Sequence, residues 1–481
     1  MSAQKISKSR PINPGKSKAV QPRNLQASRG KSARKGGNLN WVWLLFGMTG
    51  VAMLSATAGA LLAVTMTTTP LMQRQLTPKE AAIFSQDEQI SKNQGLSLPE
   101  LTRPVNILVL GIKVLTTDVD NPPPEAKNLR YQATINSFEG LSDTMLLLRF
   151  NPQTKKMVAL SIPRDTRTTV EGYGVTKINE ANADGGPALS AKATSELLGG
   201  VGIDRYVRIN VFGVEKLIDA LGGVTVYVPQ DMKYQDDSQH LYINLKAGRQ
   251  HLNGDQALQL LRFRYDGNGD IGRIQRQQMV MRALMEQALN PGTIAKLPQI
   301  LSIIQSHIDT NLSVEELIAL VGFAARTNRS NVQMLMLPGT FSTPAQYQAS
   351  YWLPDPQKID RMVGQYFKDE NSTIGQTLNP AYLKIAIQDS TGQAKAVQSL
   401  MDSLGKAGYT DVLIDRTWSE PLVQTRIVAQ QGSVEDAEAL RRALGFGEVR
   451  TESTGNLQSD ITIQLGQDIL RRTVPQGSRN P

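Results

Sequence analysis

The chain has 481 residues, 40% of them hydrophobic and 20% charged, so it is long enough for two or three globular domains. Its net charge of +9 suggests nucleic-acid binding, but residues 1–40 hold ten Lys or Arg and no Asp or Glu, which leaves 42 basic against 43 acidic residues elsewhere. Cysteine is absent and only three histidines are scattered along the chain, which excludes disulfides and thiolate metal sites and disfavours a histidine-based centre.

An uninterrupted apolar segment, residues 41–64, follows the basic tail. At ~1.5 Å per residue it forms about 36 Å of helix, which is enough to cross a bilayer. Trp41 and Trp43 lie where interfacial aromatic residues are found. A cleaved signal peptide is the alternative, but its small-residue sites would fall inside the apolar run. We therefore predict one transmembrane helix, with the tail 1–40 in the cytoplasm and the rest of the chain outside the cytoplasmic membrane.

A polar tether, residues 65–103, is expected to lead into an α/β domain. Apolar runs bounded by turn residues predict strands, and longer amphipathic runs ended by Gly or Asn-Pro predict helices. Strands that alternate with helices indicate a central sheet covered on both faces. The predicted strands are residues 105–110, 144–150, 157–162, 206–209, 224–228 and 332–337, and the predicted helices are 188–198, 211–221, 254–261, 271–289, 294–307 and 314–326.

The chain changes character after residue 337. Residues 338–379 are rich in turn residues apart from a helical pattern at 359–367, and we place the end of the α/β domain, residues 104–370, within them. A small α+β domain is predicted at 381–468, followed by a disordered tail, 469–481. No catalytic constellation is found in the small domain, so we expect a binding or scaffolding role. Its predicted strands are 383–388, 411–414, 425–429 and 461–465, and its helices 394–404 and 434–444.

Four arginines lie where a loop leads into the predicted helix 271–289. Arg273, Arg276 and Gln277 are spaced i, i+3 and i+4, which predicts that their side chains share one helix face. The planar guanidinium fork suits phosphate oxygens better than any other side chain does. A solvated basic helix paired with surface carboxylates is the alternative. The four arginines are Arg262, Arg264, Arg273 and Arg276.

Further charged residues border the predicted strands, near the strand ends where ligands gather in α/β sheets. Asp143 precedes the second strand, Arg164 and Asp165 follow the third, and Lys177 lies in the next loop. With the four arginines this makes six cations, which suits a pyrophosphate better than a single carboxylate. Asp143, Asp165 and Asp270 would orient the arginines, hold a divalent ion or accept a proton from an attacking hydroxyl. Turn formation, a local ion pair and simple exposure are the alternatives at these positions.

Seven short motifs follow one another in a fixed order from about residue 104 to 290. They are Asn106-Ile107-Leu108-Val109-Leu110-Gly111, Ser142-Asp143-Thr144-Met145, Ile162-Pro163-Arg164-Asp165, Lys177-Ile178-Asn179, Gly222-Gly223-Val224, Leu252-Asn253-Gly254-Asp255-Gln256-Ala257-Leu258 and Asp270…Arg273…Arg276-Gln277. This ordered set resembles the LytR–CpsA–Psr family, and residues 381–468 resemble the smaller C-terminal domain that some members carry.

The resemblance implies a three-layer α/β/α core with a mixed central sheet, anchored by one N-terminal helix in the cytoplasmic membrane. It implies transfer of a glycopolymer from a polyprenyl-pyrophosphate carrier to a hydroxyl of peptidoglycan or another envelope glycan, with a phosphodiester formed. Asp143 would coordinate Mg²⁺, and Asp165 or Asp270 would orient the arginines or act on the acceptor hydroxyl. The pyrophosphate would be bound by Arg164, Arg262, Arg264, Arg273 and Gln277, with Lys177 helping.

One departure bears on the metal. After the first strand's glycine the family usually has an aspartate that helps to hold magnesium, whereas here Gly111-Ile112 is followed by Lys113. Either the lysine replaces part of the metal's charge, or Asp143 holds the metal together with Asp118. The resemblance therefore supports a pyrophosphate site more firmly than a Mg²⁺ site.

Alternatives to the transferase remain at this point. A pyrophosphatase on lipid-linked or nucleotide substrates would use water as the acceptor, and a wall-binding or sensor protein would keep the fold without the reaction. A transcriptional regulator is the weakest alternative, because the basic tail has no aromatic residue or helix-turn-helix pattern. The apolar helices 294–307 and 314–326 would line a tunnel for the lipid tail or pack as ordinary core.

Overall fold

The computed structural model describes residues 75–84, 89–92, 99–113, 138–237, 241–263, 269–368, 378–430, 432–452 and 454–473. They all belong to one compact unit, Val64–Pro481. Within these ranges no helix is both long enough and apolar enough to span a bilayer. The basic tail and the predicted transmembrane segment 41–64 lie outside the described residues.

Six strands form a mixed central sheet in the order β13-β8-β3-β4-β5-β14. β3 runs parallel to β8 and antiparallel to β4, β5 is antiparallel to β4 and parallel to β14, and β13 closes the other edge antiparallel to β8. The predicted mixed sheet is therefore confirmed. The strands are β3 (Val105–Lys113), β4 (Leu141–Asn151), β5 (Lys156–Ile162), β8 (Arg205–Asn210), β13 (Ile308–Thr310) and β14 (Val332–Met336).

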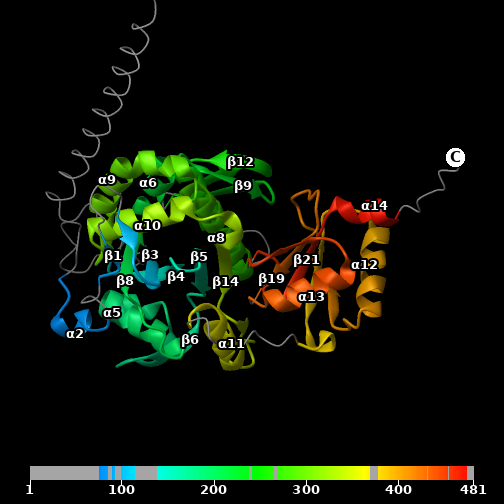
Figure 1. Cartoon of the computed structure of the whole chain (residues 1–481), viewed down its shortest axis with the longest axis horizontal. Helices are drawn as coiled ribbons and strands as arrows, with labels where there is room; N and C mark the ends of the chain where they lie inside the picture. The colour runs from blue at the N-terminus through cyan, green and yellow to red at the C-terminus, as the bar shows by residue number, and fades with distance from the viewer. Residues whose placement is uncertain are drawn as a thin grey trace, which may run out of the picture. The chain divides into compact units, whose positions relative to one another are not determined.

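Helices cover both faces of this sheet (Figure 1). Met145 and Leu147 of β4 belong to a core cluster with α5 and α11. Phe150, on the opposite face of the same strand, packs edge-on against Phe323 of α10 at 5.9 Å between ring centroids. The period of two along β4 thus supplies both cores. The helices are α5 (Glu180–Leu197) and α11 (Pro356–Tyr366) on one face, and α6 (Val211–Leu221), α9 (Leu297–His307) and α10 (Val314–Arg326) on the other.

Helix α5 starts eight residues earlier than the predicted helix 188–198. It continues through a kink at Gly186, where φ is 71°, directly before Pro187. Glycine accepts this positive φ without the penalty that a Cβ carries, so the chain can turn there and remain helical on both sides. The predicted start at residue 188 is therefore wrong, because Gly186-Pro187 forms a kink inside a longer helix.

The expected tether 65–103 is partly built into the domain. Phe84 and Ile90 are buried, and the Phe84 ring lies 5.2 Å from that of Tyr206. Burial of these two apolar side chains favours the packing of this segment onto the domain. It contains α2 (Pro78–Ala81) and a small ribbon of β1 (Ser91–Lys92) and β2 (Glu100–Leu101).

Short two-stranded ribbons, most of them unpredicted, surround the central sheet. β9 pairs with β12 and β10 with β11, and together with α7 and α8 they enclose a separate apolar cluster. The bounds are β6 (Arg167–Val170), β7 (Gly174–Lys177), β9 (Val224–Val228), β10 (Met232–Asp236), β11 (Leu241–Leu245), β12 (Gly248–Leu252), β15 (Gly339–Phe341), β16 (Trp352–Pro354), α7 (Gly254–Arg262), α8 (Gly269–Ala288), η1 (Pro291–Lys296) and η2 (Arg329–Asn331).

The C-terminal domain is a five-stranded mixed sheet in the order β18-β17-β21-β19-β20 with its own apolar core. In the expected tail from residue 469, Ile469 instead ends η4 and a one-turn helix, α14, follows, while residues 474–481 lie outside the described ranges. The elements are η3 (Pro380–Tyr382), β17 (Ile385–Asp389), α12 (Ala394–Lys406), β18 (Val412–Ile414), β19 (Arg426–Ala429), α13 (Val434–Leu444), β20 (Glu448–Arg450), β21 (Ile461–Leu465), η4 (Gln467–Ile469) and α14 (Leu470–Thr473).

Several polar contacts join this domain to the larger one. The Arg282 guanidinium lies 2.7 Å from a Glu452 carboxylate oxygen, and the Lys358 ammonium lies 2.7 Å from Asp460. The Met334 amide of β14 donates a 3.0 Å hydrogen bond to the Thr451 carbonyl. These contacts place β20 and the loop after it beside α8 and the edge of the central sheet.

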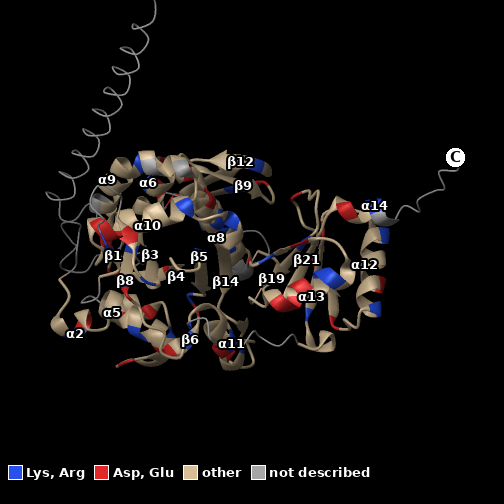
Figure 2. Cartoon of the chain, viewed as in Figure 1, with Lys and Arg blue, Asp and Glu red and all other residues tan. Residues whose placement is uncertain are grey.

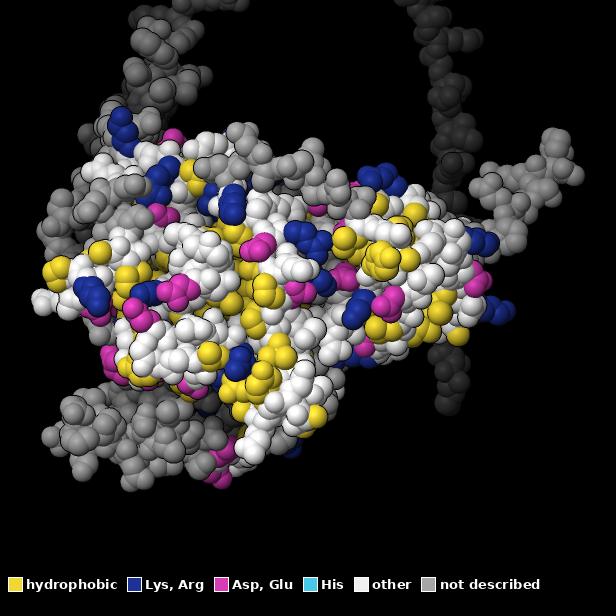
Figure 3. All heavy atoms as spheres, turned by 90° about the horizontal axis from the view of Figure 1, so that it is seen from below, with side chains coloured by type: hydrophobic (Ala, Val, Ile, Leu, Met, Phe, Trp, Pro, Cys, Tyr) yellow, Lys and Arg dark blue, Asp and Glu magenta, His cyan; other side chains and the backbone are white. Residues whose placement is uncertain are grey.

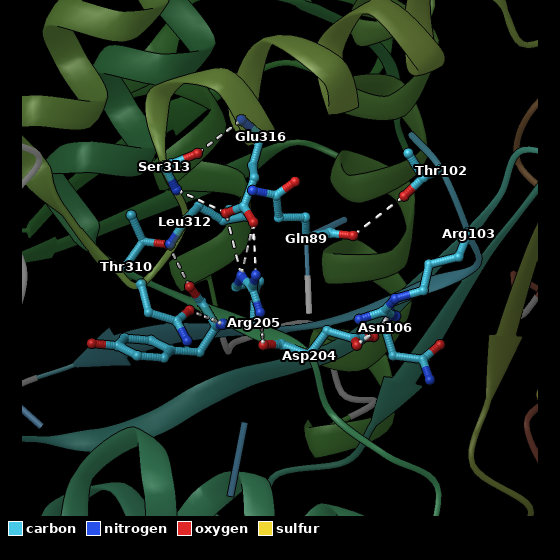
Figure 4. A network of polar contacts seen from close by, with 12 residues as sticks. Gln89, Thr102, Arg103, Asn106, Asp204, Arg205, Thr310, Leu312, Ser313 and Glu316 are labelled. Atoms are coloured by element: carbon cyan, nitrogen blue, oxygen red, sulfur yellow. Dashed lines mark hydrogen bonds and ion pairs between the residues drawn. The ribbon is translucent and has the colours of Figure 1, made fainter. Parts of the chain in front are cut away.

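A buried ion pair connects the central sheet to α10 (Figure 4). The Arg205 Nη2 atom of β8 lies 2.7 Å from Glu316 Oε1, and the two side chains are only 5% and 10% exposed. Glu316 also accepts a 2.9 Å hydrogen bond from the Ser313 amide, and its own amide donates to the Ser313 hydroxyl, which completes a capping box. One carboxylate therefore both starts the helix and fixes it to the sheet.

Candidate active site

Asp143 is positioned by a bulge between β3 and β4. Gly111 pairs with Thr144 and Ile112 with Ser142, so Asp143 is the extra residue that faces no partner on β3. Bulges of this kind redirect a side chain and are frequent beside functional sites. A Cβ on Gly111 would lie 3.0 Å from the Thr144 Cβ, so the glycine permits the close approach of the strands there.

The loop after β5 presents Arg164 and Asp165. It is held by its backbone: the Thr166 amide donates to the Pro163 carbonyl at 3.0 Å, and the Asn179 amide donates to the Arg164 carbonyl at 3.2 Å. The loop continues into the β6–β7 ribbon, whose last residue is Lys177. The ribbon folds back toward the loop, so Lys177 at its end lies beside Asp165.

These side chains form a single ionic network centred on Asp165. Its Oδ1 lies 2.8 Å from the Lys177 ammonium, and its Oδ2 lies 3.3 Å from Arg164 Nε and 3.8 Å from Arg273 Nη2 of helix α8. Arg164 also contacts Asp143, at 2.6 Å between Nη1 and Oδ1. Three cations therefore share two carboxylates, and the side chains are between 6% and 26% exposed. Such a partly buried, net positive cluster is suited to binding an anion.

A cavity of about 30 Å³ adjoins the network, lined by Asp143, Arg164, Asp165, Arg273 and Gln277. Room for two or so water molecules is too little for a pyrophosphate, so substrate must exchange with the carboxylate contacts of the arginines. A larger cavity, of about 490 Å³, lies on another side of α8. The predicted site residues Asp143, Arg164, Asp165, Arg273 and Gln277, which come from three separate segments, meet at the smaller one.

The predicted common face of α8 is only partly correct. Arg273 and Gln277 line the cavity beside Asp165, whereas Arg276 lines the larger one and donates to the Phe263 carbonyl. Residues i+3 and i+4 lie on opposite flanks of residue i, about 100° apart around the helix axis, so the two can face different neighbours.

The other predicted site residues are not seen at this cavity. Arg262 ends α7 and is not in its described lining. Asp118 and Arg264 lie outside the described residues, as do the side chains of Lys113 and Asp270. Among the residues that are described, no group of three or more metal-binding side chains occurs.

Aromatic residues at the site, among them Trp352 and Tyr351, were not predicted. The Trp352 amide donates a 2.9 Å hydrogen bond to the Asp165 carbonyl, and Trp352 lines the cavity. The Lys177 ammonium lies 5.5 Å from the ring centroid of Tyr351. Both come from the turn-rich segment 338–379, where a Tyr-Trp pair followed by Leu-Pro was the one available signal.

The structure therefore defines an α/β protein with a partly buried arginine–aspartate network beside its central sheet. Sequence comparison identifies the family: the profile of the LytR_cpsA_psr family matches residues 71–368, and the chain belongs to that family. A second profile, described as LytR cell envelope-related transcriptional attenuator, matches residues 382–468. The predicted resemblance is thereby confirmed for both domains.

Curated relatives share part of the chain. A protein of Oceanobacillus iheyensis named polyisoprenyl-teichoic acid–peptidoglycan teichoic acid transferase TagU is 38% identical over 207 residues, which cover 42% of this chain and 62% of that protein. The protein of the same name from Bacillus cereus is 34% identical, and the match covers 46% of this chain and 71% of that protein. The regulatory protein MsrR of Staphylococcus aureus is 37% identical, and the match covers 36% of this chain and 51% of that protein. The match thus spans less than two thirds of the first and third relatives.

Solved structures also resemble the chain. The crystal structure of TagV from B. subtilis has 28% sequence identity and a TM-score of 0.45, over 55% of this chain and 98% of that one.

Proposed function

We propose that the protein transfers a glycopolymer from a polyprenyl-pyrophosphate carrier to a hydroxyl of peptidoglycan or another envelope glycan. The observation that carries the proposal is the network of Arg164, Lys177 and Arg273 around Asp165, because its three cations can stabilise the negative charge of a pyrophosphate that displaces their carboxylate contacts. Two relatives of the same family are named as transferases of this kind.

The proposed reaction exchanges one phosphate ester for another. The acceptor hydroxyl oxygen forms a bond to the phosphorus nearest the glycan, and the bond from that phosphorus to the bridging oxygen breaks. Polyprenyl monophosphate leaves with the electron pair, and a phosphodiester joins glycan and acceptor. Arg164 and Arg273 would stabilise the negative charge that develops on the phosphate oxygens.

The carboxylates have different surroundings and therefore receive different proposed roles. Asp165 contacts three cations, so we assign it the task of holding them in position. The proton of the acceptor hydroxyl is assigned to Asp270 in the first turn of α8. Arg262, Arg264, Arg276 and Gln277 are proposed as further ligands of the pyrophosphate or its neighbouring sugar.

Mg²⁺ is proposed as the cofactor. Asp143 lines the cavity and offers carboxylate oxygen, which is the ligand chemistry that Mg²⁺ prefers, and one or two carboxylates beside substrate phosphates are a common arrangement for this ion. Asp118 would be the second carboxylate. When bound, the ion would neutralise charge on the pyrophosphate oxygens.

Removal of divalent cations tests this assignment. We expect EDTA to lower the transfer rate of the purified protein at least about tenfold, and added Mg²⁺ to restore it. Asp143→Asn should raise the Mg²⁺ concentration that is needed for half-maximal rate. A rate that EDTA leaves unchanged would show that the reaction proceeds without a divalent ion.

We also propose that residues 41–64 anchor the protein in the cytoplasmic membrane with the catalytic domain outside the cytoplasm. The absence of native cysteine allows single-cysteine labelling. In intact spheroplasts, a membrane-impermeant maleimide should label Ala394→Cys, at an exposed position of α12, and should label Ser9→Cys only after lysis. Equal labelling of both positions before lysis would contradict this topology.

The function itself is tested with the full-length protein in detergent, lipid-linked glycan as donor and peptidoglycan as acceptor. We expect release of polyprenyl phosphate that depends on the acceptor. Release at the same rate without acceptor would identify a pyrophosphatase, and no release under any condition would favour a binding protein.

A further inference from the structure

A second cationic site lies on another side of helix α8. It is a groove of about 490 Å³ between α8, β9 and the C-terminal domain, within the range of volumes found for ligand pockets. Seven arginines and two glutamates line it. Figure 2 shows Lys and Arg residues, in blue, along α8 and on β12. On the face shown in Figure 3, by contrast, Lys and Arg side chains are interspersed with Asp and Glu.

Part of this positive charge is not neutralised. Arg282 and Arg329 both pair with Glu286, at 3.2 and 2.9 Å, and Arg426 pairs with Glu420 at 3.2 Å. Arg249 and Arg416 are exposed, and within the described part of the chain neither forms an ion pair; Arg416 donates to the Gln275 side chain instead. Two guanidinium groups at the groove are therefore available for an anion.

Cations are also crowded on the inner wall of the groove. Burial lowers the pKa of Arg426, Glu420 opposes this, and the nearby charges of Arg450 and Arg282 lower it further. These three arginine side chains are only 16% to 19% exposed. A bound anion would relieve the repulsion among them, because an opposite charge favours the protonated form of each.

The groove also offers aromatic side chains. Tyr227 of β9 and Trp418 line it, and the Trp418 indole N–H is buried without a hydrogen-bond partner among the described residues. Tyrosine and tryptophan combine an apolar ring with a polar tip, so they can pack against the apolar face of a sugar and donate to its hydroxyls. Arginines beside such rings suit a saccharide that carries carboxylate or phosphate groups.

We propose that this groove binds an anionic segment of a glycopolymer, with its charged groups on Arg249 and Arg416 and a sugar ring against Trp418. Gly272 and Gln275 of α8 line the groove, and Arg273 lines the cavity beside Asp165. A polymer in the groove therefore lies next to the transfer site across one helix. That this polymer is the donor chain rests on the proposed function, whereas the binding itself does not.

Binding of short oligomers to the full-length protein in detergent tests the proposal. The probes are oligogalacturonate, which carries carboxylates, a glycerol-phosphate oligomer, which carries phosphodiesters, and a neutral galactose oligomer of the same length. We expect the wild-type protein to bind at least one anionic probe, more weakly as salt is raised, and to bind the neutral one at least about tenfold more weakly. The tighter anionic probe identifies carboxylate or phosphate as the recognised group.

The double variant Arg249→Gln/Arg416→Gln should bind the anionic probe at least about tenfold more weakly than wild type, since charge-assisted hydrogen bonds are lost. The matched control is Arg361→Gln/Arg442→Gln, which removes the same charge from exposed positions on α11 and α13 and should bind as wild type does. Equal affinity of the double variant and wild type, or equal affinity of wild type for neutral and anionic probes, would overturn the proposal.

Carrier binding, measured on the same samples, separates this inference from the proposed function. If the wild type retains polyprenyl pyrophosphate but has no affinity for the anionic oligomers, the groove proposal is wrong and the proposed function still stands. Salt-sensitive oligomer binding that requires Arg249 and Arg416, in a protein that neither binds nor cleaves the carrier, would keep the groove and remove the transferase.

Discussion

Replacement of Arg273 by alanine is expected to lower the transfer rate about a thousandfold. The guanidinium is 6% exposed, lies 3.8 Å from Asp165 and lines the cavity to which we assign the pyrophosphate. Loss of one preorganised group that stabilises developing charge costs about 10²–10³ in rate, and loss of an arginine that contacts the transferred phosphate costs up to about 10⁵. Measurement of kcat and KM with lipid-linked donor checks the effect.

Two further variants show whether the lower rate reflects the role of Arg273 at the site rather than a general effect of replacing an arginine. Arg273→Lys keeps the charge but not the planar fork, so we expect an intermediate rate. Arg361→Ala, on α11, should transfer at the wild-type rate. Native mass spectrometry should show polyprenyl pyrophosphate on the wild type and not on Arg273→Ala, with both proteins melting at similar temperatures. An Arg273→Ala protein that is folded and fully active would remove Arg273 from the site.

Replacement of Glu316 by alanine is expected to lower the free energy of unfolding by about 3–5 kcal/mol. Glu316 holds Arg205 at 2.7 Å, and both side chains are buried (Figure 4). Removal of one partner leaves the other charge uncompensated in a poorly solvated position, which is the costly way to break a buried ion pair. Loss of the capping box adds to the effect. The melting temperature should fall by an amount on the order of 10 °C.

Controls for this prediction lie in the same helix. Glu315→Ala removes the neighbouring acidic residue of the first turn of α10 and should cost only a few tenths of a kcal/mol. Arg205→Met/Glu316→Leu replaces both charges by apolar side chains and should recover most of the loss, because neither charge is then left unpaired. A Glu316→Ala protein as stable as Glu315→Ala would show that the ion pair contributes nothing.

Strongly patterned elements could be predicted from the sequence. The predicted helices 211–221, 314–326 and 434–444 and the strands 224–228 and 461–465 have the same bounds in the structure. Each combines a clear apolar period with a glycine or a capping residue at an end. Strands such as β10 (Met232–Asp236) could not be predicted, because their residues are mostly polar and partly exposed, and only pairing with a partner such as β11 makes them strands.

The central part of the site could also be predicted, because Asp143, Arg164, Asp165 and Lys177 border strands or their loops. The contribution of Trp352 could not, since it depends on a contact between residues 165 and 352 that no local pattern encodes. The same reason hides the second groove. Its arginines come from positions between 249 and 450, and only the packing of the C-terminal domain against α8 brings them together.

The most direct test of the proposed transferase follows the phosphate itself. A donor with ³²P in the phosphate next to the glycan is incubated with full-length protein and peptidoglycan. We predict that the label enters peptidoglycan as a phosphodiester together with the glycan, and that unlabelled polyprenyl monophosphate is released in equal amount. Label recovered as free glycan phosphate, or retained in the carrier lipid, would contradict the account.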